Sequence, residues 1–179
     1  MTKADITAIH PIHEWQQGYI RFADDVPVSE VLQRHRSIFR ADDLVKLKQL
    51  GDQVYAPGKW TAKDILQHLI DTEHILSYRA LRIARNDQTA LPGFDEEHFA
   101  IHTNASQRTI EDLLHEFDLV RQTTIALFSS FDKPMLRRTG LCSNIINSTL
   151  ALAYIIAGHP LHHVQVLRDR YFPRINLSI

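Results

Sequence analysis

The sequence predicts an all-α protein built as a four-helix bundle. Four segments carry apolar residues at the 3.6-residue spacing of an amphipathic helix, and loops marked by Gly and Pro separate them. No segment shows the sustained apolar–polar alternation that is typical of a half-buried β-strand. With 179 residues, of which 44% are hydrophobic, the chain is long enough to bury the core of one domain.

The first predicted helix spans roughly residues 29–50, and Ser29 can cap its start. Its inward stripe consists of Leu32, His35, Ile38, Phe39 and Val45. Leu44, Leu47 and Leu50 fall off this stripe. Because exposed apolar clusters often mark a partner surface, these three leucines favour a homodimer.

The second predicted helix, residues 61–86, has the clearest start signal. Thr61 can serve as the N-cap, and Asp64 three residues later completes a pattern like a capping box. Trp60, just before the cap, can pack on Ile65 as a hydrophobic staple. This segment is therefore expected to begin sharply at Thr61.

A third helix is predicted over residues 109–130, with Thr109 and Asp112 repeating the cap pattern. The connection before it, residues 87–108, is long. Connections of this length are usually functional or partly structured, and we expect a short helix near residues 95–100.

The fourth predicted helix, residues 147–171, is apolar on two sides, as expected for the central helix of a bundle. Pro160 lies inside it. Because proline lacks a backbone N–H, we expect a kink beside His159.

Histidine is the residue type that departs most from ordinary composition, with 11 copies. His159 and His163 are one helical turn apart and replace apolar residues on an inward stripe. Two neutral imidazoles in a core need polar partners, and a shared cation supplies both at once. His68, on the inward stripe of the second helix, is the preferred third ligand, whereas His35 is a weaker candidate and His74 points to another face.

Three histidines without cysteine suit a divalent transition metal. We expect zinc or nickel, with iron, cobalt or manganese as alternatives, rather than calcium or magnesium. Three protein ligands leave a coordination position for a water molecule. Asp71, one turn after His68, is the candidate catalytic base, although an ordinary solvated carboxylate is an equal alternative. Each histidine could instead be a hydrogen-bonded core residue without a metal.

Several classes of protein are disfavoured by composition. A formal net charge of −1 gives no basic surface for nucleic acid. The longest apolar run, residues 150–157, is shorter than the about 20 residues of a membrane span, and the N-terminus does not resemble a signal peptide. The one cysteine, Cys142, excludes an internal disulfide. We therefore expect a cytoplasmic protein that acts on a small molecule, with no nucleic-acid or membrane partner.

Three segments together resemble DinB-like proteins, a superfamily that includes YfiT-like metal-dependent hydrolases. They are residues 56–73, 78–95 and 151–165, the last containing Gly-His-Pro-Leu-His-His-Val-Gln. The resemblance implies an up-and-down four-helix bundle, often dimeric, with one divalent metal on three histidines. Carried over to this chain, those ligands are His68, His159 and His163. The match covers about residues 26–171, so we divide the chain into an N-terminal extension, 1–26, and a bundle domain, 27–179.

Relatives of this family are described as metal-dependent hydrolases or as low-molecular-weight thiol S-transferases. The resemblance thus implies an enzyme in which the metal activates a thiol or water. In such an enzyme we expect Asp71, from its position after His68, to accept the proton. The alternative is a non-catalytic metal-binding bundle of the stress response, and a metal-free interaction module is a third possibility. Residue types alone do not separate hydrolysis from thiol transfer.

Overall fold

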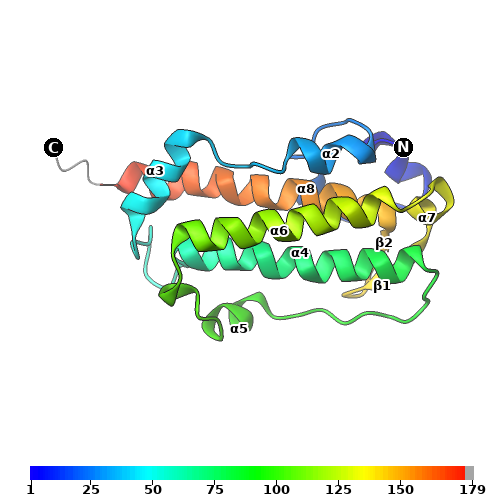
Figure 1. Cartoon of the computed structure of the whole chain (residues 1–179). Helices are drawn as coiled ribbons and strands as arrows, with labels where there is room; N and C mark the ends of the chain where they lie inside the picture. The colour runs from blue at the N-terminus through cyan, green and yellow to red at the C-terminus, as the bar shows by residue number, and fades with distance from the viewer. Residues whose placement is uncertain (176–179) are drawn as a thin grey trace.

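The computed structural model describes residues 1–175 and places the long helices side by side (Figure 1). The helices are α1 (Glu14–Ile20), α2 (Val28–Arg34), α3 (Ala41–Leu50), α4 (Ala62–Ala84), α5 (Glu96–Ile101), α6 (Ile110–Ser129), α7 (Lys133–Arg137) and α8 (Thr149–Val166), with short 3₁₀ or π segments at Lys3–Ala8, Ala105–Gln107, Leu167–Tyr171 and Phe172–Arg174. The all-α four-helix bundle is confirmed, since α4, α6 and α8 form three positions of the bundle and α2 with α3 forms the fourth.

The predicted helix starts are confirmed for α4 and α6. The Thr61 hydroxyl accepts a hydrogen bond from the backbone N–H of Asp64, and the Asp64 carboxylate accepts one from the backbone N–H of Thr61. Thr109 caps α6 through the N–H of Asp112, and the short helix predicted in the long connection is α5. These caps satisfy backbone donors that have no partner inside a helix, which is why their sequence signal is reliable.

The single first helix predicted over residues 29–50 is wrong, because the chain leaves the helix after Arg34 and starts α3 at Ala41 (Figure 1). The break changes the phase of the apolar stripe. Leu47 and Leu50 are buried, whereas Val45 is 55% exposed. Leu47 and Leu50 therefore pack inside their own chain, Leu44 is partly buried against the same cluster, and the homodimer stays a prediction from family resemblance.

The sequence analysis also missed a β-hairpin between α7 and α8. Strand β1 (Thr139–Cys142) pairs antiparallel with β2 (Ile145–Ser148). The two turn residues, Ser143 and Asn144, both have positive φ, which is the backbone of the favoured two-residue hairpin turn. Serine followed by asparagine is a weaker turn signal than Asn-Gly, and four-residue strands are too short to show alternation.

Within the bundle the helix directions do not alternate strictly up and down, because α4 and α6 run in the same direction. The side-chain contacts advance in the same direction along both segments, from Gln67 with Arg108, just before α6, through Glu73–Arg121 to Ser77–Thr124. Residues 85–109 cross back along the bundle to permit this (Figure 1). The long connection noted in the sequence is therefore a crossover that passes α4 and carries α5.

The N-terminal residues pack on α8 at a close helix crossing. A Cβ atom added to Gly158 would lie 2.1 Å from the backbone oxygen of Tyr19, so only glycine permits this approach. Ile6 and Ile20 are buried in the same core as α8. The crossing places Tyr19 beside His159, while the proposed domain boundary at residue 26 stays a prediction.

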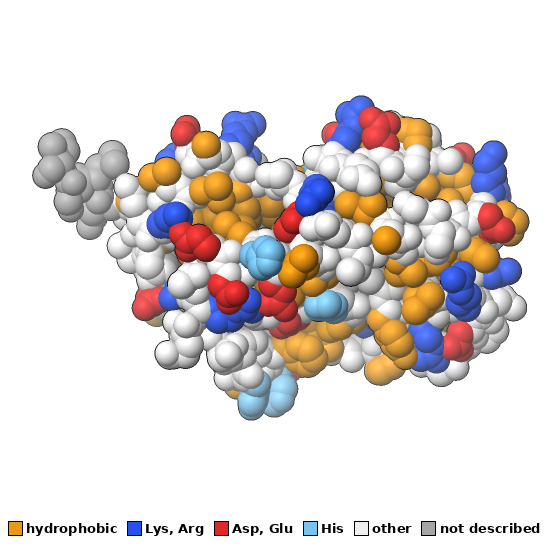
Figure 2. All heavy atoms as spheres, viewed as in Figure 1, with side chains coloured by type: hydrophobic (Ala, Val, Ile, Leu, Met, Phe, Trp, Pro, Cys, Tyr) orange, Lys and Arg blue, Asp and Glu red, His pale blue; other side chains and the backbone are white. Residues whose placement is uncertain are grey.

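Helix α8 is the central helix of the bundle, as its two apolar sides predicted. With the turns that follow it, Thr149–Arg174 is long and apolar enough to cross a membrane by length and composition, but 72% of its most apolar stretch is buried inside the bundle. Two apolar clusters form the core, one at each end of α8. On the face seen in Figure 2, acidic and basic side chains are interspersed.

We expect Gly158→Ala to lower the free energy of unfolding by about 1–3 kcal/mol, because the added methyl group overpacks the crossing with α1. Chemical denaturation measures this change. Gly18→Ala is the matched control, since a Cβ at that α1 position meets no atom within 4 Å and alanine suits a helix interior better than glycine. Equal destabilisation by the two variants would contradict the packing assigned to Gly158.

Candidate metal centre

Three histidines from two helices converge in the middle of the bundle. His68 lies two turns into α4, and His159 and His163 are one turn apart on the facing side of α8. Nε2 of His159 lies 3.1 Å from Nε2 of His68 and 3.1 Å from Nε2 of His163. One ligand atom from each of the three residues lies within 4.8 Å of the others. The structure therefore brings together the three residues selected from the sequence.

This donor set fits one transition-metal ion. Two nitrogens that each lie about 2.1 Å from a tetrahedral ion are about 3.4 Å apart, close to the separations found here. Imidazole nitrogens suit zinc, nickel, iron or cobalt better than calcium or magnesium, which prefer oxygen ligands. Within residues 1–175, this is the one group of three or more His, Cys, Asp or Glu side chains with such geometry.

Electrostatics keep the three rings neutral, which is the form that binds a metal. Burial lowers the pKa of His68 to about 4 and, together with the neighbouring His68 and His162, lowers the pKa of His163 to about 3. Burial and then the charge of His163 hold the pKa of His159 well below its ordinary value. Protonation is disfavoured because two or three cationic rings would share one buried space. At neutral pH the nitrogens are free to act as ligands.

Surrounding side chains orient the histidines. Nδ1 of His68 lies 3.4 Å from the Thr72 hydroxyl, so a proton on Nδ1 leaves Nε2 free for a metal. The Trp60 ring is 4.8 Å from the His68 ring, and Tyr19 meets His159 edge-on at 5.1 Å. The sequence analysis missed Thr72 and Tyr19 as neighbours of the site. Only the i,i+4 spacing from His68 could have indicated Thr72, and no local signal indicated Tyr19.

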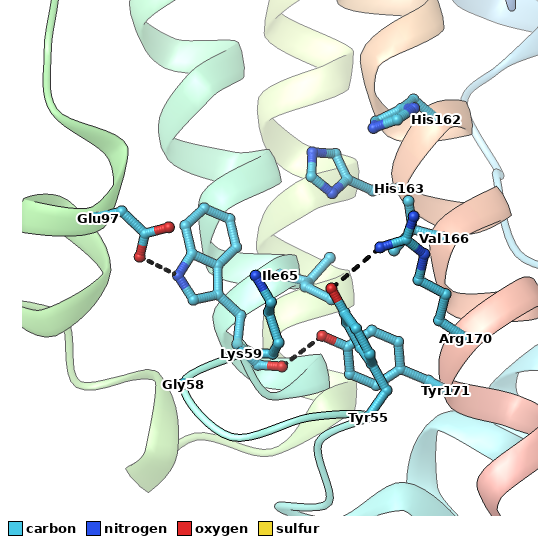
Figure 3. A pocket seen from close by; sticks show the side chains of 11 residues that line it. Tyr55, Gly58, Lys59, Ile65, Glu97, His162, His163, Val166, Arg170 and Tyr171 are labelled. Carbon is cyan, nitrogen blue, oxygen red and sulfur yellow. Dashed lines mark hydrogen bonds between the residues drawn. The ribbon is translucent and has the colours of Figure 1, made fainter.

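The metal centre opens to the surface through a cavity of about 290 Å³ on the side of His163 (Figure 3). The cavity is lined by Tyr55, Gly58, Lys59, Trp60, Ile65, Glu97, His162, His163, Val166, Arg170 and Tyr171. Glu97 from α5 accepts a hydrogen bond from the Trp60 indole at 3.0 Å, which leaves its second carboxylate oxygen without a side-chain partner in the described part of the chain. A small molecule in this cavity would contact the edge of the metal centre.

The other predicted residues lie elsewhere. Asp71 accepts a hydrogen bond from Gln67 and lines a different cavity with His74, and burial raises the pKa of its carboxyl group. His35 ends α2 outside the three-histidine group, next to Asp24. Cys142 is buried in the hairpin.

Pro160 does not interrupt α8, which continues to Val166. Proline leaves the backbone oxygen of Ile156 without its usual helical donor. Arg121 supplies the missing hydrogen bond, with Nη2 3.1 Å from that oxygen. The side chain of Arg121 therefore compensates for the proline inside the helix turn that carries His159.

Both the sequence and the fold of this chain are similar to known proteins. A model of the DinB superfamily matches residues 13–167. The structure resembles YfiT from Bacillus subtilis, which is described as a probable metal-dependent hydrolase with an unusual four-helix bundle topology. The TM-score is 0.59 at 15% sequence identity, over 89% of this chain and 90% of that chain, so the likeness shows a shared fold. No curated protein sequence matches the chain.

The lowered histidine pKa values predict that the metal-free protein loses stability as the pH falls. The unfolded histidines take up protons near pH 6.5, while folded His68 and His163 stay neutral down to about pH 4 and 3. Between pH 6.5 and 4 the free energy of unfolding should fall by up to about 1.4 kcal/mol per pH unit for each group.

Denaturant titrations of metal-free protein at pH 7 and pH 5 measure this loss. The His163→Gln variant should show a smaller loss than the wild type. His74→Gln should behave like the wild type, because His74 is exposed. A stability that does not change between the two pH values would contradict the buried, neutral state of the three rings.

Proposed function

The chain belongs to the DinB superfamily, and from this premise we propose that it is a metal-dependent enzyme that activates water or a thiol at the three-histidine centre. The observation that supports this most directly is that one ligand histidine, His163, also lines a surface cavity. A structural metal site is typically closed by four protein ligands, whereas a catalytic site keeps a position open. Three ligands beside a cavity favour catalysis over the structural alternative.

In this proposal His68, His159 and His163 hold one divalent ion, with zinc or nickel as the first candidates. The bound ion supplies positive charge that stabilises a hydroxide or thiolate near neutral pH and polarises an electrophile. Thr72 orients the His68 ring, and Tyr19 and Trp60 restrict the positions of the imidazoles. The chain's own part is to hold neutral ligands in a fixed geometry and to admit a small substrate on one side.

Two carboxylates compete for the role of general base. Asp71 follows His68 by one turn, but it lines a cavity that none of the three histidines lines. Glu97 lines the same cavity as His163, and the Trp60 indole fixes one of its oxygens. We therefore rank Glu97 above Asp71 as the group that accepts the proton of the nucleophile.

The residues that line the cavity indicate the kind of substrate it can hold. Its walls combine aromatic rings from Trp60, Tyr55 and Tyr171 with the cations Lys59 and Arg170. Arg170 donates to the Tyr55 hydroxyl at 3.2 Å, so its charge is held at one end of the cavity (Figure 3). Hydrolysis of an activated ester and transfer of a low-molecular-weight thiol both remain within this proposal. The proposal also includes a homodimer, on family resemblance, and a cytoplasmic location, on the sequence composition.

Metal binding is the first test. We expect the wild-type protein to bind about one zinc ion per chain and to gain thermal stability with added zinc, because a ligand that binds only the folded state stabilises it. His163→Ala should lose both effects, whereas His74→Ala should keep them. Elemental analysis and thermal unfolding give the two readouts. Equal zinc content in the two variants would contradict the proposed ligands.

Catalysis is tested on zinc- or nickel-loaded protein with p-nitrophenyl acetate, and with a small thiol plus an electrophilic aryl halide. Glu97→Gln should lower kcat about 10²-fold or more, as expected for loss of a general base. Asp71→Asn should lower kcat less than Glu97→Gln does. A larger loss in Asp71→Asn would reverse the ranking, and full activity after chelation would favour a structural metal instead.

A further inference from the structure

A second cavity, of about 280 Å³, lies beside the β-hairpin, and a buried guanidinium group forms part of its wall. Among its lining residues are Trp15, Arg79, Phe94, Cys142, Ser143 and Ile145. Arg79, in the second-to-last turn of α4, is only 6% exposed. Buried arginines are normally paired with an acidic group, so the partners of this one need to be accounted for.

The partners of Arg79 are all neutral. Its Nη2 donates to the backbone oxygen of Pro92 at 2.8 Å and to the Ser143 hydroxyl at 3.0 Å. Within residues 1–175, no carboxylate oxygen lies within 4.0 Å of its nitrogens. A guanidinium group has five N–H donors, so further donors remain available.

These remaining donors are accessible from open space. In the described part of the chain, the fully buried polar side-chain atoms without a hydrogen-bond partner are His35 Nε2 and Thr149 Oγ1. Nε and Nη1 of Arg79, for which the structure shows no hydrogen bond, are not among them. They are therefore reachable by a molecule of the size of water or by a ligand atom.

Comparison with Arg121 shows what Arg79 lacks. Arg121 is fully buried and donates to both oxygens of Glu73, each at 2.8 Å. Arg79 has no such counter-ion, and burial lowers the pKa of its guanidinium group. A largely buried charge without an opposite charge is costly, so an anion that reaches its open donors through the cavity would be favoured. Carboxylates match the guanidinium fork with two parallel hydrogen bonds.

We propose that this cavity is a binding site for a small carboxylate with an apolar or aromatic body, held through its carboxylate by Arg79. The rest of the lining fits such a body, because Leu76, Leu152 and Ile145 are apolar and Trp15 and Phe94 are aromatic. Glu96 also lines the cavity, but its carboxylate is not within 4.0 Å of Arg79 and does not neutralise it.

The site is separate from the metal centre. Arg79 follows His68 by 11 residues on α4, which corresponds to about 16 Å along the helix axis. The two cavities share no lining residue. Arg79 also borders an outer hollow together with Tyr78 and Arg82, so the test must distinguish the inner cavity from this surface.

The test is calorimetric titration of the full-length, metal-free protein with benzoate and with benzamide, its uncharged analogue. Benzoate should bind and benzamide should bind at least tenfold more weakly, because only the carboxylate pairs with the guanidinium. Arg79→Gln should weaken benzoate binding at least tenfold. Arg82→Gln, a nearby arginine of the outer hollow that pairs with Asp87, should bind benzoate like the wild type.

A cavity-filling pair covers the case in which Arg79→Gln does not fold. Ile145→Phe places a larger ring in the inner cavity and should abolish benzoate binding while Arg79 is intact. Ile146→Phe is the matched control, because Ile146 is the next residue of β2, is 52% exposed and does not line the cavity. This variant should bind benzoate normally.

The remaining outcomes overturn the proposal. Equal binding of benzoate and benzamide would show that the charge of Arg79 is not used. Loss of binding in Arg82→Gln with retention in Ile145→Phe would place the ligand in the outer hollow. Loss in His163→Ala with retention in Arg79→Gln would place the carboxylate at the metal centre. No heat of binding at tens of millimolar benzoate would mean that the cavity takes no such ligand.

Discussion

The buried ion pair between Arg121 and Glu73 is the interaction around which the bundle is organised. Arg121 on α6 donates to both carboxylate oxygens of Glu73 on α4, to the backbone oxygen of Ile156 on α8 and to that of His35 at the end of α2. One side chain thus joins all four positions of the bundle. Because both charges are removed from water, the pair is favourable only with every partner in place. The four helices are therefore held in a single register.

The same register positions the metal centre. Glu73 lies five residues after His68 on α4, and Ile156 lies three residues before His159 on α8. Through Glu73 and Ile156, Arg121 therefore bridges the two helices that carry the histidines. Pro160 leaves the Ile156 oxygen free to accept from Arg121. A proline that would weaken an isolated helix thereby frees a backbone oxygen to accept a hydrogen bond in the polar layer formed by Arg121, Glu73 and the histidines. This layer separates the two apolar clusters of the core.

The parallel arrangement of α4 and α6 has a functional consequence. It requires the crossover of residues 85–109, which passes along α4 instead of closing a short loop. The crossover contributes Glu97 to the cavity at the metal centre and Phe94 to the cavity at Arg79. Both cavities therefore have a wall that is not part of the bundle. Substitutions in the crossover can change what the cavities bind without changing the core of the bundle.

Local sequence signals were enough to predict the long helices, the caps of α4 and α6 and the three inward histidines, because each of these depends on a pattern within one helix: the 3.6-residue period, an N-cap such as Thr61, and polar residues on an inward stripe. The tertiary structure alone decided the break after α2, the hairpin, and the contact of Tyr19 with His159. The hairpin is local, but its strands are too short and its turn signal too weak to be recognised. The break and the Tyr19 contact involve residues distant in the chain, as in the hydrogen bond of Arg121 to the backbone oxygen of His35 and the packing of Tyr19 on Gly158, and such contacts leave no local pattern. The carboxylate that lines the cavity of His163 could not be predicted from spacing for the same reason. Asp71 is the neighbour along the helix, but the crossover brings Glu97 to the cavity.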